Sequence, residues 1–332
     1  MSIAAAEPRG RSRPDACSLL WDQAHASALG TAPAARFWLA LEQNGPWGAR
    51  AATQSHLDPD LGRSLDRMCQ DAGGRFILIR RPGSHSDQRD RTRQVQTHRV
   101  YLGAGLAALP WLLQADLDDP ARLKQLDQLP GAALGSGDIN AVQAAMGELQ
   151  CSPRPVLLIC SNSRRDLCCS VRGRPVALES GSQRPGQVWE CSHTGGHRFA
   201  PTGVLLPYGQ TFGRLCAVSA VAALDAAARG ELPAELLGAA CDRGRSHLGA
   251  PEQAAESVVR AHIGELRLHA LSTTAAPRAD RENAWQCQVT HLDGRRWDVV
   301  AVRGPSGDNL PESCGKQAVP TWRWTVVNDS DR

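Results

Sequence analysis

The segment V-L-L-I-C-S-N-S-R-R-D-L-C-C, residues 156–169, is the most informative part of the chain. Its first four residues are all apolar, and a short run of this kind is typical of a strand that is buried on both faces. The run ends at Cys160, and a polar loop over residues 161–167 leads to Cys168 and Cys169, where we expect a helix. The segment therefore predicts a strand, a loop and a helix, with cysteines on both sides of the loop.

The residues that follow predict three more strands and a second helix. We expect strands at 188–191, 203–206 and 211–215, and a helix at 217–229 that Gly230 ends. The order strand, helix, strand, strand, strand, helix is thioredoxin-like. The predicted fold class is therefore α/β, with a thioredoxin-like domain as the central unit.

Length and pattern divide the chain into further units. A chain of 332 residues is long enough for two domains or one large one. Upstream, a helix at 56–72 and a strand at 75–81 indicate an α/β domain, whose order of elements permits a second, degenerate thioredoxin-like unit. Downstream, Pro251 suits the first turn of a helix, and Asp293-Gly294 predicts a hairpin. The predicted organisation is a disordered lead-in at 1–14, an N-terminal α/β domain at 15–150, the thioredoxin-like domain at 151–245 and a small α+β extension at 246–332.

Two cysteines and two histidines form a pattern that indicates a metal site. Cys160 and Cys169 have the spacing C-x8-C, and the pair His193 and His197, spaced H-x3-H, begins twenty-four residues after Cys169. Both pairs follow predicted strands, at the edge where ligands collect in open α/β sheets. Thiolate and imidazole together suit zinc or an iron–sulfur cluster. Two glycines between the histidines favour a loop, which would let the backbone approach a cluster closely.

Several motifs carry a resemblance to a known family. C-S-N-S-R-R-D-L-C-C is followed by V-W-E-C-S-H-T-G-G-H-R-F-A and by L-P-Y-G-Q-T-F-G-R. Together they resemble the sucrase/ferredoxin-like family, whose members include proteins with a thioredoxin-like ferredoxin domain. The runs W-L-A-L-E-Q-N-G-P-W-G and P-E-Q-A-A-E-S-V-V-R are also similar to its patterns. The resemblance extends over residues 17–327.

The resemblance implies a [2Fe–2S] cluster and an electron-transfer function. Carried over, Cys160 and Cys169 hold one iron, and His193 and His197 hold the other. Two neutral imidazoles make such a cluster less negative, which raises its potential above the roughly −400 mV of plant-type ferredoxins. An imidazole that loses its second proton in the oxidised state would couple electron transfer to proton transfer. The implied partners are a reductase and an acceptor protein. Many relatives carry His where this chain has Asn162, a position at which we expect no ligand.

Two other functions stay open on the residues alone. A structural zinc-binding module would use the same four ligands, although zinc motifs more often pair cysteines at a shorter spacing. A thiol–disulfide oxidoreductase would use Cys160 or the pair Cys168-Cys169, although the C-x-x-C motif is missing. Three roles are open for Cys168, an alternative ligand, a redox partner or a packing residue, and we favour packing. We expect Cys191 to lie near the cluster. The other cysteines show no paired ligand spacing and are expected to be structural or incidental: Cys17, Cys69, Cys151, Cys216, Cys241, Cys287 and Cys314.

Composition and charge argue against several classes of function. The formal net charge is +3, and 35 of the 37 basic residues are arginine, so we expect no nucleic-acid partner. No stretch suits a membrane span and the N-terminus lacks the apolar core of a signal peptide, so we expect a cytoplasmic protein without membrane association. Eleven cysteines in the cytosol indicate metal or redox chemistry rather than disulfides. No carboxylate pair marks a sugar site, so we expect an electron carrier rather than a hydrolase.

Overall fold

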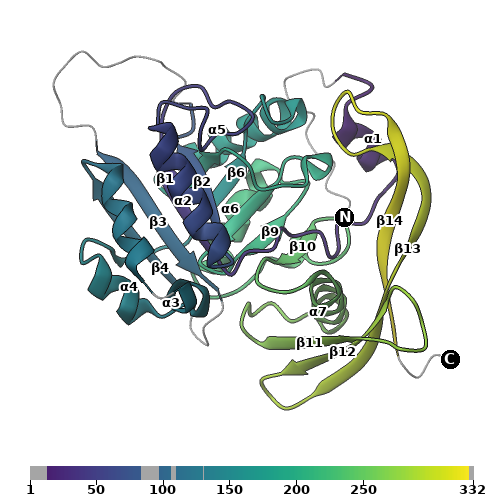
Figure 1. Cartoon of the computed structure of the whole chain (residues 1–332). Helices are drawn as coiled ribbons and strands as arrows, with labels where there is room; N and C mark the ends of the chain where they lie inside the picture. The colour runs from purple at the N-terminus through teal and green to yellow at the C-terminus, as the bar shows by residue number, and fades with distance from the viewer. Residues whose placement is uncertain (1–12, 84–96, 106–109, 130, 329–332) are drawn as a thin grey trace.

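The chain folds into a large mixed sheet, a smaller antiparallel sheet and the helices that cover them (Figure 1). The computed structural model describes residues 13–83, 97–105, 110–129 and 131–328, so the predicted lead-in at 1–14 lies almost wholly outside the described residues. The α/β class that the sequence predicts is confirmed. Within the described part of the chain, no helix is both long and apolar enough to cross a membrane.

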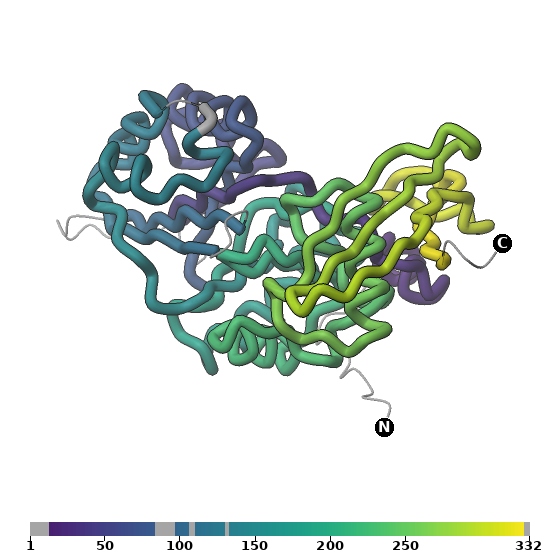
Figure 2. Tube along the Cα trace, turned by 90° about the horizontal axis from the view of Figure 1, so that it is seen from below, coloured from purple at the N-terminus to yellow at the C-terminus, as the bar shows by residue number. Residues whose placement is uncertain are grey.

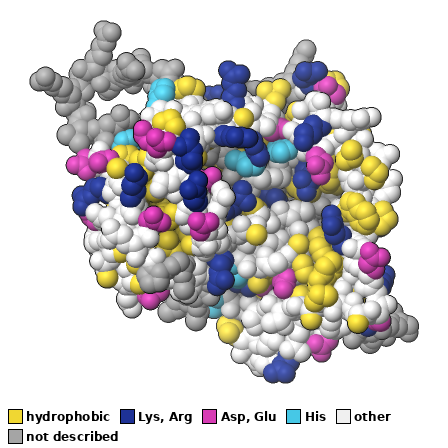
Figure 3. Space-filling model, viewed as in Figure 1, with side chains coloured by type: hydrophobic (Ala, Val, Ile, Leu, Met, Phe, Trp, Pro, Cys, Tyr) yellow, Lys and Arg dark blue, Asp and Glu magenta, His cyan; other side chains and the backbone are white. Residues whose placement is uncertain are grey.

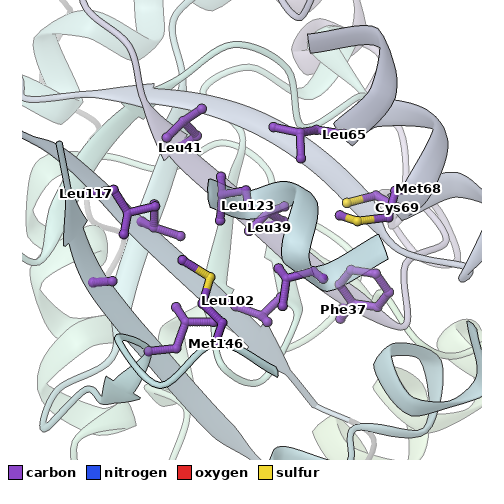
Figure 4. Packing of buried hydrophobic residues seen from close by; sticks show 14 of the residues in the cluster. Phe37, Leu39, Leu41, Leu65, Met68, Cys69, Leu102, Leu117, Leu123 and Met146 are labelled. Atoms are coloured by element: carbon purple, nitrogen blue, oxygen red, sulfur yellow. The ribbon is translucent and has the colours of Figure 1, made fainter. Parts of the chain in front are cut away.

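The N-terminal half of the large sheet packs one face against helices. Its first strand pairs in parallel with the second and antiparallel with the third. The third strand pairs antiparallel with the fourth. Phe37, Leu39 and Leu41 alternate along β1 and meet Leu65 and Met68 of α2 (Figure 4). The elements are α1 (Cys17–Gln23), β1 (Phe37–Glu42), α2 (Pro59–Asp71), β2 (Arg75–Arg80), β3 (His98–Ala104), β4 (Trp111–Leu117), η1 (Pro120–Gln128), α3 (Gly131–Ser136), α4 (Ile139–Ala145) and β5 (Gln150–Cys151).

The second half of the large sheet contains the predicted central unit. Strands β6 (Val156–Cys160) and β7 (Val188–Cys191) are parallel. Strand β8 (Gly203–Leu206) pairs antiparallel with β6, and β9 (Gln210–Phe212) pairs antiparallel with β8. The four predicted strands and both helices are present, although the first helix opens with a π-helical turn. The elements are β6 (Val156–Cys160), η2 (Cys169–Gly173), α5 (Arg174–Gln183), β7 (Val188–Cys191), η3 (His197–Phe199), β8 (Gly203–Leu206), β9 (Gln210–Phe212), α6 (Ala217–Ala227), η4 (Ala234–Leu236) and β10 (Asp242–Arg245).

The two halves form one continuous sheet of ten strands, in the order β10-β9-β8-β6-β7-β2-β1-β3-β4-β5. The register of β2 with β7 pairs Ile79 with Cys191 and Arg80 with Glu190, and the N–H of Ser192 donates to the carbonyl oxygen of Leu78 at 2.9 Å beside it. A buried apolar cluster reinforces this junction, because Trp38 of β1 packs in the same cluster as side chains of β6, β7 and β8. The predicted boundary between residues 150 and 151 stays a prediction; it falls within β5, and β2 and β7 hydrogen-bond the two halves to one another.

The C-terminal part is the α+β extension that the sequence predicts. Helix α7 (Ala250–Ile263) packs on a four-stranded antiparallel sheet, β11 (Leu271–Pro277), β12 (Ala284–His291), β13 (Arg296–Pro311) and β14 (Ala318–Asn328). The predicted hairpin across Asp293-Gly294 joins β12 and β13. The far end of the β13–β14 hairpin reaches α1, where the indole Nε1 of Trp21 donates to the carbonyl oxygen of Pro311 at 2.9 Å. Figure 1 and Figure 2 both show α1 beside this far end of the β13–β14 hairpin.

Candidate metal centre

Cys160 and Cys191 end two neighbouring parallel strands of the large sheet. The register pairs Cys160 of β6 with Cys191 of β7, and both side chains are buried. Cys169 begins η2, which packs directly on the end of β6. A Cβ atom on Gly173 would lie 2.2 Å from the carbonyl oxygen of Cys160, so only glycine permits this approach. Gly173 therefore lets η2 bring Cys169 close to Cys160.

The three buried thiols are linked by hydrogen bonds. Cys160 accepts hydrogen bonds from Cys169, from Cys191 and from the ring of His193. These hydrogen bonds, of which the one from Cys169 has the largest effect, hold the pKa of Cys160 well below its ordinary value. The same hydrogen bond with Cys160, together with burial, raises the pKa of Cys169. Burial raises the pKa of Cys191. The thiolate is the metal-binding form of cysteine, and the lowered pKa of Cys160 favours that form.

His193 and His197 lie on the loop that follows β7. Gly195 and Gly196 both adopt left-handed backbone conformations, with φ of +76° and +72°. The loop brings the two imidazole rings into a stacked arrangement, with centroids 6.3 Å apart. The buried Arg243 holds this loop, because its Nη1 donates to the carbonyl oxygen of Gly195 at 3.0 Å and its guanidinium occupies the space that a Cβ on Gly196 would need. The loop that the two glycines predict is therefore present.

Both imidazoles have a buried nitrogen atom without a partner. Among the described residues, Nδ1 of His193 and Nδ1 of His197 make no hydrogen bond. A buried polar atom without a partner costs about 1–3 kcal/mol, and a bound metal would satisfy both atoms. Burial also lowers the pKa of His197, which favours the neutral, metal-binding form of its ring. The donor set fits a metal group that takes thiolate and imidazole ligands.

The structure brings three of the four predicted ligands into contact and places the fourth beside them. Cys160 hydrogen-bonds with Cys169 and His193, and His197 stacks on His193. Asn162 lies outside this group, because its Nδ2 donates to a backbone carbonyl of the loop after β1 at 3.0 Å. Asn162, at which we expect no ligand, thus holds a loop.

A second group of cysteines lies next to the first. The ligand atoms of Cys17, Asp166, Cys168 and Cys314 all lie within 4.8 Å of one another, so that they could hold a metal ion. The sequence predicts no ligand role for these cysteines, because Cys17 and Cys314 are 297 residues apart and no spacing motif links them. Cys168 does pack in a small apolar cluster, as predicted, but its thiol also faces two other thiols.

Asp166 lies between the two groups. Its Oδ2 accepts hydrogen bonds from the hydroxyl of Ser313 at 2.8 Å and from the backbone N–H of Cys314 at 3.0 Å, and its Oδ1 accepts one from the N–H of Cys168 at 2.9 Å. Burial alone would raise the pKa of this carboxyl, but the hydrogen bonds lower it overall. Oδ2 also lies 3.8 Å from Nε2 of His197. One carboxylate thus contacts both groups of potential ligands.

A groove of about 540 Å³ opens beside His193 and is rich in arginine. It lies between the loop after β1, helix α2 and the loop that carries Asp166. Figure 3 shows basic side chains gathered around histidine at a hollow in this face of the molecule. The charged residues that line it are Arg50, Arg63, Asp66, Arg75 and Arg165.

Comparison with known proteins identifies the family. The sucrase/ferredoxin-like family model matches residues 28–231, which is more than half of the chain, and the chain therefore belongs to that family. No curated protein and no solved structure matches it. The matched segment contains all four predicted ligands, whereas Cys17 and Cys314 lie outside it. The family resemblance seen in the sequence is confirmed.

Proposed function

We propose that the protein is an electron carrier in which Cys160, Cys169, His193 and His197 ligate a [2Fe–2S] cluster. The observation that carries the proposal is the meeting of two buried cysteines with two stacked imidazoles whose Nδ1 atoms have no partner among the described residues. Two thiolates and two imidazoles are the donor set of [2Fe–2S] centres with raised potential. A bound cluster supplies reversible one-electron transfer. Coupling of this transfer to an imidazole proton is part of the proposal.

The geometry favours a cluster of two irons over a single zinc ion. Among the described residues, the group in which three or more ligand atoms lie within 4.8 Å of one another is the one around Asp166, and the four proposed cluster ligands do not form such a group. A single tetrahedral ion needs all of its ligands around one point. A cluster of two irons does not need all four ligands around one point, because each iron takes one pair of them.

The strand order supports a thioredoxin-like fold for this unit. The order β9-β8-β6-β7, with a parallel β6–β7 pair joined through α5, places the two cysteines and the two histidines at one end of the sheet. The N-terminal half repeats the arrangement as β4-β3-β1-β2, with α2 joining the parallel pair. We infer that both halves are thioredoxin-like and that the N-terminal one carries no cluster ligands of its own.

The surrounding residues indicate the side from which electrons reach the site and the charge that lies beside it. His193 and His197 are partly exposed whereas Cys160 and Cys169 are buried, so the imidazole side is the route between the site and a partner. The buried Arg243 places positive charge near the two thiols and offsets negative charge that a reduced site gains. Burial lowers its pKa to about 9, which still leaves it protonated at neutral pH.

The full chain, purified without oxygen, is expected to contain about two irons and two acid-labile sulfides and to absorb broadly in the visible range. Metal and sulfide assays on the same sample as the spectrum provide the measurement. A colourless protein in which zinc is bound by these four residues would replace the electron-carrier proposal with the zinc-binding module. A metal-free protein whose activity depends on its thiols would support the thiol–disulfide oxidoreductase instead.

We propose that the basic groove beside His193 receives an acidic redox partner. Four arginines against one aspartate give the groove a positive potential, and such a field raises the association rate of negatively charged partners. Arg50 and Arg63 are exposed at its rim and are not cluster ligands, so their charge can be changed without altering the cluster itself.

The double variant Arg50→Glu, Arg63→Glu is expected to oxidise more slowly with ferricyanide and faster with hexaammineruthenium(III). Because the first probe is an anion and the second a cation, charge reversal moves the two rates in opposite directions, by about tenfold at low salt. Stopped-flow oxidation of the reduced protein measures both. Arg295→Glu, an exposed arginine outside the groove, is the matched control. Equal rates in both variants with both probes would remove the groove from the electron-transfer route.

A further inference from the structure

We infer that Cys17, Cys168 and Cys314, together with Asp166, bind one zinc ion that ties α1 and the turn between β13 and β14 to the core. The three cysteines come from α1, from the loop before η2 and from the turn between β13 and β14. This site is distinct from the proposed cluster, and two of its ligands lie outside the segment that the family model matches.

The spacing of the three sulfur atoms is that of ligands around one ion. Sγ of Cys17 lies 3.5 Å from Sγ of Cys168 and 3.6 Å from that of Cys314, and the Cys168–Cys314 distance is 3.1 Å. Zinc–thiolate bonds of about 2.3 Å at tetrahedral angles place two sulfurs about 3.8 Å apart. The three sulfurs therefore already form the compact triangle that a tetrahedral ion requires, and a small outward adjustment would seat it.

Asp166 supplies the fourth ligand. Both of its carboxylate oxygens lie 3.9 Å from Sγ of Cys17. Apart from the Cys17 thiol, Oδ2 accepts hydrogen bonds from Ser313 and Cys314, and Oδ1 accepts one from the N–H of Cys168. Once the Cys17 thiol loses its proton, Oδ1 keeps a lone pair that can face the ion. The hydrogen bonds from Cys168 and from the β13–β14 turn orient this carboxylate, which is how the outer shell of a metal site positions a ligand.

The donor set selects the metal. Three thiolates exclude calcium and magnesium, which bind through oxygen. Four ligand atoms within 4.8 Å of one another suit a single tetrahedral ion. Three thiolates, a carboxylate and Zn²⁺ leave a net negative charge, and Arg198 lies close enough to Cys17 to interact with it electrostatically. Arg13 lines a cavity of about 80 Å³ that adjoins Cys168 and Cys314 and gives an ion a way in.

This zinc site stabilises the attachment of α1 and the β13–β14 hairpin to the core. Cys17 and Cys168 belong to one small apolar cluster, and Trp21 and Leu310 to another, so few apolar side chains attach α1 and the hairpin to the core. Metal binding that requires the folded arrangement adds its free energy to folding. One ion therefore fastens α1 and the β13–β14 hairpin to the loop that also carries Cys169.

The test is the zinc content of the full chain and of single variants. Wild-type protein is expected to hold about one zinc per chain besides its iron, and Cys17→Ser and Cys314→Ser are each expected to lose most of that zinc but keep their iron and visible spectrum. Cys151→Ser and Cys216→Ser, at exposed cysteines, are the matched controls and keep both metals. Zinc-edge X-ray absorption is expected to show three sulfurs at about 2.3 Å and one oxygen at about 2.0–2.2 Å.

Three results would overturn the inference. The first is wild-type protein that folds, carries its iron and holds no zinc. The second is unchanged zinc in both Cys17→Ser and Cys314→Ser. The third is a disulfide between Cys168 and Cys314 in protein handled without oxygen, detected by mass spectrometry of alkylated peptides. Because iron reports on the cluster and zinc on this site, failure of one proposal is distinguishable from failure of the other.

Discussion

Cys169→Ser is expected to abolish the visible colour and remove nearly all the iron, whereas the neighbouring Cys168→Ser keeps both. The two residues are adjacent in the chain but face different groups. Cys169 hydrogen-bonds to Cys160 on the cluster side, and Cys168 faces Cys17 and Cys314. A hydroxyl is a poor ligand for iron, so the loss of one thiolate ligand opens the cluster to solvent and to loss of iron.

The measurement is iron, sulfide and visible absorption per chain for the two variants, purified side by side. The pair is well matched because both substitutions change a buried thiol to a hydroxyl at the start of the same helical turn. Retained colour in Cys169→Ser with loss of colour in Cys168→Ser would exchange the roles of the two cysteines. Retained colour in both would refute thiolate ligation from this loop.

The strands of the central unit could be predicted because their signals are local. β6 is short and buried along its whole length, and the apolar run V-L-L-I shows that in the sequence. β10 has the sequence D-R-G-R and gives no such signal, yet Asp242 and Arg243 are buried. Asp242 accepts a hydrogen bond from Gln210 at 2.7 Å, and Arg243 donates to Thr31. The burial of these charges depends on partners that are distant in sequence, which no window of residues reveals.

The same distinction separates the two proposed metal sites. The sequence could single out the four proposed cluster ligands because C-x8-C and H-x3-H are local spacings. The group around Asp166 could not, because Cys17 and Cys314 are brought together only when α1 and the β13–β14 hairpin pack on the core. The sequence held a weaker signal, an odd set of eleven cysteines in a chain expected to be cytoplasmic. That count indicates metal chemistry but does not show which cysteines meet.

A buried ion pair holds the junction of the two halves beside the cluster site. Nη2 and Nε of Arg80 donate to Oε2 of Glu190 at 2.7 Å and 2.9 Å, and the hydroxyl of Ser161 donates to the same oxygen at 2.8 Å. The guanidinium also lies over the ring of Trp47, 4.3 Å from its centroid. The side chains of Arg80 and Glu190 are 9% and 1% exposed. Since Ser161 follows Cys160 and Glu190 precedes Cys191, this pair fixes the strand ends that carry both cysteines.

Glu190→Ala is expected to lower the free energy of unfolding by about 3–5 kcal/mol, because it leaves the Arg80 guanidinium buried and unpaired. Glu190→Gln retains an acceptor oxygen and is expected to cost less. Asp116→Ala, which breaks the more exposed pair with Arg99, is the control and is expected to cost at most about 1 kcal/mol. Urea unfolding followed by tryptophan fluorescence measures all three. A Glu190→Ala protein as stable as Asp116→Ala would show that strand pairing and apolar packing around Trp38 hold the halves together without this ion pair. If instead the variant is destabilised and also loses iron faster to a chelator, the junction between the halves is part of what retains the cluster.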